Sequence, residues 1–188
     1  MRIRFTKMHG LGNDFVVIDG ISQKIKLSPD KIRALSDRRF GVGCDQVLLV
    51  EIPESPDVDF RYRIYNYDGS EVENCGNGAR CFARFVQDRK LSGKNCIKVE
   101  TAGGILTLNV LGNGDVCVDM GEPKLSPAEI PFVAEQQASQ YQVAVDSQVF
   151  GVDTLQLAAV SMGNPHAVIE VDDVDTDAVE AWGEALQN

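Results

Sequence analysis

The sequence is organised around one stretch, NYDGSEVENCGNGARCFARFV, which runs from Asn66 to Val86. It begins where the alternating strand pattern of Phe60–Tyr67 ends. Asp68-Gly69 then supplies a turn, because glycine accepts the positive φ angle that most residues refuse. Beyond Asn77 the apolar residues recur at the i, i+3, i+4 and i+7 spacing of a helix that lies on a core: Ala79, Phe82, Ala83 and Val86. The stretch therefore predicts a strand, a turn and a central helix.

Cys75 directly precedes this helix, which opens with Gly76-Asn77-Gly78. The first N–H groups of a helix have no partner inside it and carry the positive end of its dipole. Glycines leave room for an anion, such as a substrate carboxylate, to reach those amides, and the same field favours the thiolate form of a cysteine. The pattern indicates a carboxylate site beside an activated sulfur. A buried structural cysteine next to a glycine-rich turn is the alternative, and the motif alone leaves both open.

The composition is that of a folded globular protein, with 188 residues, 44% hydrophobic residues and a net charge of −10. The acidic balance argues against a nucleic-acid partner. No apolar run reaches membrane-spanning length, and Met1–Phe5 has a strand pattern rather than that of a signal peptide. We therefore expect a cytoplasmic protein without a membrane partner.

The cysteine count is odd, and no two cysteines are spaced as C-x-x-C: Cys44, Cys75, Cys81, Cys96 and Cys117. Neither histidine, His9 or His166, is close to a cysteine in sequence. We expect reduced thiols and no metal site, with Cys81 filling the core.

Three amide side chains stand at the ends of predicted strands. Asn13 closes the loop His9–Asn13 between strands at Arg2–Met8 and Asp14–Asp19, where a simple turn asparagine is the alternative. Gln46 ends a loop that leads into the strand Val47–Ile52. Asn66 continues the inner row of its strand, so a polar amide is expected to point inward and to need a partner.

The remaining patterns predict a helix beginning at Ser28-Pro29, where Ser28 is the cap, and a closing helix near Thr176–Leu186. Strands are expected at Asn95–Glu100, Ile105–Val110, Val116–Met120, Tyr141–Val145, Leu155–Met162 and Ala167–Val171. The proline-rich segment after Gly121 predicts a boundary between residues 1–120 and 121–188. Many short strands and few helices predict an α+β fold with an antiparallel-rich sheet.

Four ordered motifs together resemble the diaminopimelate epimerase family: Lys7–Phe15, Gly41–Gln46, Asn66–Arg84 and Ser161–His166. The resemblance covers essentially the whole chain. It implies two similar α+β halves, each a sheet wrapped around a central helix, with the substrate between them. It also implies interconversion of LL- and meso-diaminopimelate without a cofactor or metal, in lysine and peptidoglycan biosynthesis, by a protein that is a homodimer at full length.

The resemblance also assigns roles to residues. Cys75 matches one of two catalytic cysteines, and His166 matches a supporting histidine beside the reacting centre. Gly76 and Asn77 match residues that hold the reacting carboxylate. The other positions that match substrate contacts are Asn13, Gln46, Asn66 and Asn164.

The chain departs from the family pattern in one respect. Epimerisation needs a base on one face of the α-carbon and an acid on the other, and the family takes its second cysteine from a later Cys-Gly motif. Cys-Gly occurs here only at Cys75-Gly76. We therefore expect the second half to be incomplete and the 188-residue chain to be inactive alone. A related proline racemase-type isomerase and a non-catalytic binding fragment are the alternatives.

Overall fold

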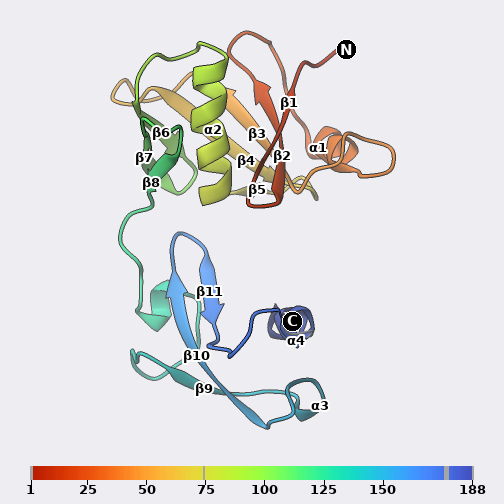
Figure 1. Cartoon of the computed structure of the whole chain (residues 1–188), viewed down its shortest axis with the longest axis vertical. Coiled ribbons are helices and arrows are strands. Elements are labelled where there is room, and N and C mark those ends of the chain that lie inside the picture. Colours follow the sequence, from red (N-terminus) through yellow and green to blue (C-terminus); the bar gives the residue numbers. More distant parts are fainter. Residues whose placement is uncertain (1, 74, 176–177, 188) are drawn as a thin grey trace. The chain divides into compact units, whose positions relative to one another are not determined.

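The computed structural model describes residues 2–73, 75–175 and 178–187, and it divides the chain into two compact units (Figure 1). The first unit is Met1–Gly121 and the second is Glu122–Asn188. Each unit has its own sheet and its own hydrophobic cluster. We describe the two units separately.

In its described residues, the first unit combines one mixed sheet with two helices, α1 (Pro29–Ser36) and α2 (Gly76–Asp88). Its strands are β1 (Thr6–Gly10), β2 (Asn13–Asp19), β3 (Gln46–Glu51), β4 (Phe60–Asn66), β5 (Glu71–Val72), β6 (Cys96–Thr101), β7 (Gly104–Val110) and β8 (Val116–Asp119). The strand order is β1-β2-β3-β4-β6-β7-β8, with β5 paired to β4. Among the described strands of this sheet, only the pairs β2–β3 and β4–β6 are parallel. The α+β class with an antiparallel-rich sheet is confirmed.

The sheet curls around α2. This helix contacts β1 at one edge of the sheet and β8 at the other, as well as β2, β3 and β7 between them (Figure 1). The predicted apolar stripe faces inward, since Ala79, Phe82, Ala83 and Val86 are all fully buried. Phe82 packs its ring against those of Phe60 and Tyr62 on β4. The central helix is therefore the core of the unit, as its sequence period indicates.

A second cluster covers the opposite face of the sheet beneath α1. Tyr65 is only 6% exposed there, next to Val47 and Leu49 of β3 and Ile32 of α1. The alternation along β4 places Tyr65 in one row with Arg61 and Arg63, and the sequence predicts that this row faces solvent. For Tyr65 this prediction is wrong. Alternation predicts which residues share a face, but the packing of α1 decides whether that face is wet.

The first hairpin is tighter than expected. β1 begins at Thr6 and runs through His9 to Gly10, and β2 already begins at Asn13. The turn is only Leu11-Gly12, with φ angles of 53° and 87°. Two residues with positive φ match the twist of paired strands, so the ladder continues almost to the tip. Asn13 is therefore fixed opposite Gly10 instead of lying in an open loop.

The second unit has a three-stranded sheet of order β11-β10-β9, formed by β9 (Tyr141–Ala144), β10 (Thr154–Ser161) and β11 (Pro165–Val168). Its helical segments are η1 (Pro127–Glu129), α3 (Ser147–Phe150) and α4 (Ala178–Gln187). α3, which the sequence patterns did not predict, is capped by Asp146. β11 starts two residues before the predicted strand, because Pro165 and His166 pair with Ser161 and Val160. The predicted helix start at Thr176 lies outside the described residues.

Gly78 gives a test of the packing of α2. A Cβ atom there would lie 2.3 Å from the hydroxyl of Tyr62. We expect Gly78→Ala to destabilise the protein by about 1–3 kcal/mol through overpacking. Gly93→Ala is the control, because a Cβ at Gly93 meets nothing within 4 Å. Equal urea midpoints for the two variants would contradict the close packing described here.

Candidate active site

Cys75 caps the N-terminus of α2. Its backbone is extended, with φ −153° and ψ 114°, and its Sγ accepts a hydrogen bond from the Gly78 N–H at 3.4 Å. Its carbonyl oxygen accepts from the N–H of Ala79 at 2.8 Å and from the hydroxyl of Tyr62 at 3.4 Å. The side chain is half-buried. The sulfur therefore lies at the positive end of the helix without being sealed in the core.

The next two backbone amides, those of Gly76 and Asn77, have no hydrogen-bond acceptor among the described residues. Both residues are partly exposed. The side-chain oxygen of Asn77 accepts from the guanidinium of Arg80, one turn along the helix. Two helix-start amides beside an accessible sulfur form an arrangement suited to a carboxylate.

Gly10 allows the first hairpin to approach this helix start. A Cβ at Gly10 would lie 3.2 Å from the carbonyl oxygen of Asn77. The close approach brings Asn13, which pairs with Gly10 across the hairpin, to Cys75. The Cys75 Sγ donates to the Asn13 side-chain oxygen across 3.7 Å. The structure thus joins four predicted site residues: Asn13, Cys75, Gly76 and Asn77.

Gln46 and Asn66 form a second predicted group at the same end of the sheet. Gln46 begins β3 opposite Asn66, the last residue of β4, and its Nε2 donates to the Asn66 side-chain oxygen at 2.9 Å. The Oε1 of Gln46 is buried and has no hydrogen-bond partner among the described residues. Since a buried carbonyl oxygen is costly to leave unpaired, this atom marks a place for a donor from a ligand.

A charged cluster that contacts Asn13 through Asp45 was not predicted from the sequence. It consists of Lys7, Asp14, Arg38 and Asp45. Hydrogen bonds from Arg38, and others from Lys7 and the Asp45 N–H, hold the pKa of Asp14 well below its usual range. In the sequence, Asp14 and Asp45 are direct neighbours of the predicted site residues Asn13 and Gln46. This adjacency is the feature of the sequence that could have indicated the cluster.

The remaining cysteines have different surroundings. Cys44 and Cys81 are buried, and burial raises the pKa of the Cys81 thiol. Cys96 and Cys117 are exposed, in β6 and β8. Neither of the two adjoins a helix start. The expected core position of Cys81 is confirmed.

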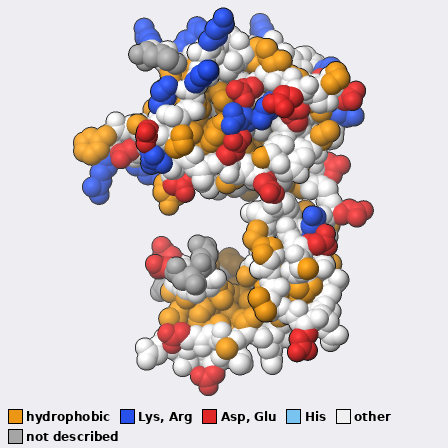
Figure 2. Space-filling view, turned by 180° about the vertical axis from the view of Figure 1, so that it is seen from behind, with side chains coloured by type: hydrophobic (Ala, Val, Ile, Leu, Met, Phe, Trp, Pro, Cys, Tyr) orange, Lys and Arg blue, Asp and Glu red, His pale blue; other side chains and the backbone are white. Residues whose placement is uncertain are grey.

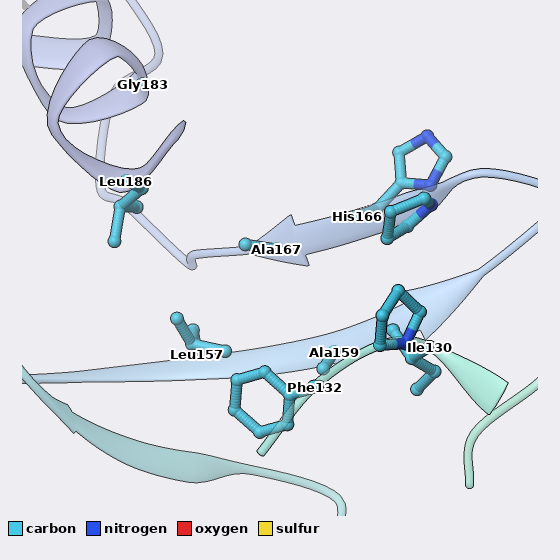
Figure 3. A pocket seen from close by; sticks show the side chains of 10 residues that line it. Ile130, Phe132, Leu157, Ala159, His166, Ala167, Gly183 and Leu186 are labelled. Carbon is cyan, nitrogen blue, oxygen red and sulfur yellow. The ribbon is translucent and has the colours of Figure 1, made fainter. Parts of the chain in front are cut away.

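The other two predicted site residues, Asn164 and His166, lie in the second unit. His166 is exposed on β11, and its Nδ1 lies 2.8 Å from the carbonyl oxygen of Asn164. It lines one part of a pocket of about 470 Å³ (Figure 3). The other lining residues are mostly apolar, including Ile130, Leu157, Ala159 and Leu186. Figure 2 shows apolar side chains gathered in a hollow of this unit.

Several solved structures share this fold. A hydroxyproline epimerase from Agrobacterium vitis matches with a TM-score of 0.62 and 15% identity, over 89% of this chain and 51% of the other. A phenazine biosynthesis protein of the PhzF family from Bacillus anthracis matches with a TM-score of 0.55 and 18% identity, over 95% and 57%. At these identities the likeness shows only the fold, which is the α+β architecture of these two proteins.

Sequence comparison is more specific. The model of the family described as diaminopimelate epimerase matches residues 5–126. Diaminopimelate epimerases from Pseudomonas paraeruginosa and Teredinibacter turnerae are 58% and 57% identical, each over 187 residues. The chain belongs to the diaminopimelate epimerase family. It is matched over its whole length and spans 66% of the length of each of these relatives. None of the described helices is long and apolar enough to cross a membrane.

The surroundings of Cys75 predict its reactivity. We expect iodoacetamide at neutral pH to modify Cys75 faster than the other four cysteines, because its sulfur is accessible and lies at a helix start. Mass mapping of partly alkylated protein measures the order. The exposed Cys96 and Cys117 are internal controls for exposure alone. Earlier modification of Cys117 or Cys81 would count against an activated sulfur.

Proposed function

We propose that this chain supplies the first catalytic cysteine and the carboxylate site of a diaminopimelate epimerase. The observation that carries the proposal is the half-buried Cys75 sulfur beside the helix-start amides of Gly76 and Asn77, in a chain of this family. The reaction would interconvert LL- and meso-2,6-diaminopimelate in the cytoplasm, for lysine and peptidoglycan synthesis. No cofactor is invoked, and a homodimer is proposed for a protein of the relatives' length.

The chemistry is proton transfer at an α-carbon. One cysteine, as a thiolate, takes the α-proton from one face, and the electron pair that remains is delocalised onto the carboxylate. A second cysteine, as a thiol, returns a proton to the opposite face. The carboxylate becomes more negative in the transition state, so amides aimed at it stabilise that state preferentially. This is the physical reason for an acid/base sulfur and an anion site to share one helix start.

The second sulfur is proposed to come from outside these 188 residues. Cys44 and Cys81 are buried in the first unit, and Cys96 and Cys117 lie on strands. None of the four stands beside a glycine-opened helix, whereas Cys75 does. We propose that residues 122–188 belong to the other half of the enzyme, with His166 in a supporting role.

The amide side chains support an extended polar substrate. Gln46 has an unpaired buried oxygen, and Asn13 and Asn66 lie at the same end of the sheet. We propose that these groups, together with Asn164, contact the amino and carboxyl groups of diaminopimelate. A compact ring substrate, as in the proline racemase-type alternative, has fewer polar groups for such a set.

Turnover by the chain itself tests the two-base assignment. We expect the 188-residue protein to give no conversion of LL- to meso-diaminopimelate when the products are separated by chiral chromatography, because only one site cysteine is present. Titration calorimetry with the same substrate then reports any binding without turnover. Conversion at a rate typical of full-length relatives would show that the second base has been wrongly assigned.

Replacement of Cys75 tests the catalytic role. In a protein of the relatives' length, Cys75→Ser should lower kcat by at least about 100-fold, because a hydroxyl is a far weaker acid/base group at neutral pH. Serine is a favourable helix cap, so the unfolding midpoint should change little. Cys96→Ser, on exposed β6, is the matched control and should retain activity. Retained activity in Cys75→Ser would refute the proposal.

Replacement of Gln46 tests the binding role. Gln46→Met keeps the length of the side chain and removes the unpaired oxygen, but it also removes the hydrogen bond from Nε2 to Asn66, so the free energy of unfolding should change by no more than about 1 kcal/mol. Affinity for diaminopimelate should fall by about tenfold, which corresponds to the loss of a typical hydrogen bond to a charged donor. Gln142→Met, at an exposed position of β9, is the control. Unchanged affinity would remove Gln46 from the site.

A further inference from the structure

The orientation of the Asn13 side chain is decided by its neighbours. An asparagine amide has an acceptor end and a donor end of nearly the same shape, and either can face a sulfur. The oxygen of Asn13 faces the Cys75 Sγ across 3.7 Å, and its Nδ2 donates to the Asp45 Oδ2 at 2.9 Å. A carboxylate can only accept, so the contact with Asp45 excludes the reversed amide.

Asp45 is itself held firmly. Its Oδ2 also accepts from the backbone N–H of Asp14 at 3.0 Å, and its Oδ1 accepts from Arg38 Nη2 at 2.7 Å. Arg38 is in turn fixed by two hydrogen bonds to Asp14, of 2.8 and 3.1 Å. The carboxylate thus has a donor on each oxygen before Asn13 is counted. Such charge-assisted hydrogen bonds are shorter and stronger than those between neutral groups.

We propose that Asp45 is a positioning residue, which acts through Asn13 to present an amide oxygen, and not an amide nitrogen, to the Cys75 sulfur. This inference rests on the proposed function of Cys75. Its consequence is a sulfur with two opposite contacts. The Gly78 N–H donates to the sulfur and suits a thiolate, whereas the Asn13 oxygen accepts from it and suits a thiol. A cysteine that takes a proton in one direction of the reaction and returns one in the other has to be stable both as a thiolate and as a thiol.

Other titratable and charged groups around Cys75 belong to the elements packed against it. Tyr62 of β4 and Cys81 of α2 interact electrostatically with Cys75, and Arg80 of α2 lies near the helix start. Tyr62 is fully buried, and burial raises its pKa well above the ordinary value. These groups are the same in every variant proposed below, so they do not alter the comparison.

Two substitutions of Asp45 separate amide orientation from charge. Asp45→Asn removes the charge but keeps an oxygen that can accept from Asn13. Asp45→Leu removes both, which leaves the Asn13 amide free to turn its nitrogen toward the sulfur. We expect alkylation of Cys75 by iodoacetamide at pH 7 to be about threefold or more faster in Asp45→Leu than in Asp45→Asn.

The same substitutions in an Asn13→Ala background complete a double-mutant cycle. If Asp45 acts through Asn13, the difference between Leu and Asn at position 45 should vanish there. A difference that persists without Asn13, or equal rates for the two variants when Asn13 is present, would overturn the proposal. Alkylation is measured on the 188-residue chain, so the result is independent of whether the chain epimerises diaminopimelate.

A measurement on the unmodified protein covers the case in which Asp45→Leu does not fold. The Asn13 side-chain nitrogen and the Asp45 carboxyl carbon should show a through-hydrogen-bond NMR coupling, because Nδ2 donates to Oδ2. Its presence supports the proposed orientation. A well-resolved Asn13 amide without this coupling would overturn it.

Discussion

The structure of the first unit depends on the close approach of strands to the start of α2. Gly10 lets the first hairpin reach the backbone of Asn77, and Gly78 leaves the space that the Tyr62 hydroxyl fills. A side chain at either glycine would move the helix away from the sheet. Because Cys75 caps this helix, the same contacts that close the core also set the position of the sulfur.

The site uses groups that every helix and sheet contains. Helix-start amides without intrahelical partners provide the anion site, and strand ends provide fixed positions for amide side chains. Asn13, Gln46 and Asn66 lie at one end of three adjacent strands, so their spacing is set by the ladder and not by flexible loops. Rigid placement of this kind is what a proton transfer at one carbon atom requires.

Charge has a supporting role in this arrangement. Arg38, Asp14 and Asp45 are partly exposed, so their ion pairs add little to stability. Their role is to fix positions, because Asp14 holds Arg38, Arg38 holds Asp45, and Asp45 in turn holds Asn13. Figure 2 shows acidic and basic side chains side by side on one face of the first unit.

The sequence by itself determined the central helix, the position of Cys75 directly before it, the α+β class and the family, because these follow from local spacing and from motifs of contiguous residues. Only the tertiary structure decided that Tyr65 is buried, that Asn13 begins a strand, and that Asp45 holds Asn13. Those three facts depend on contacts between residues more than 30 positions apart or on the geometry of a two-residue turn. Local pattern carries no direct record of such contacts, since side-chain burial and hydrogen bonding are settled when distant elements pack.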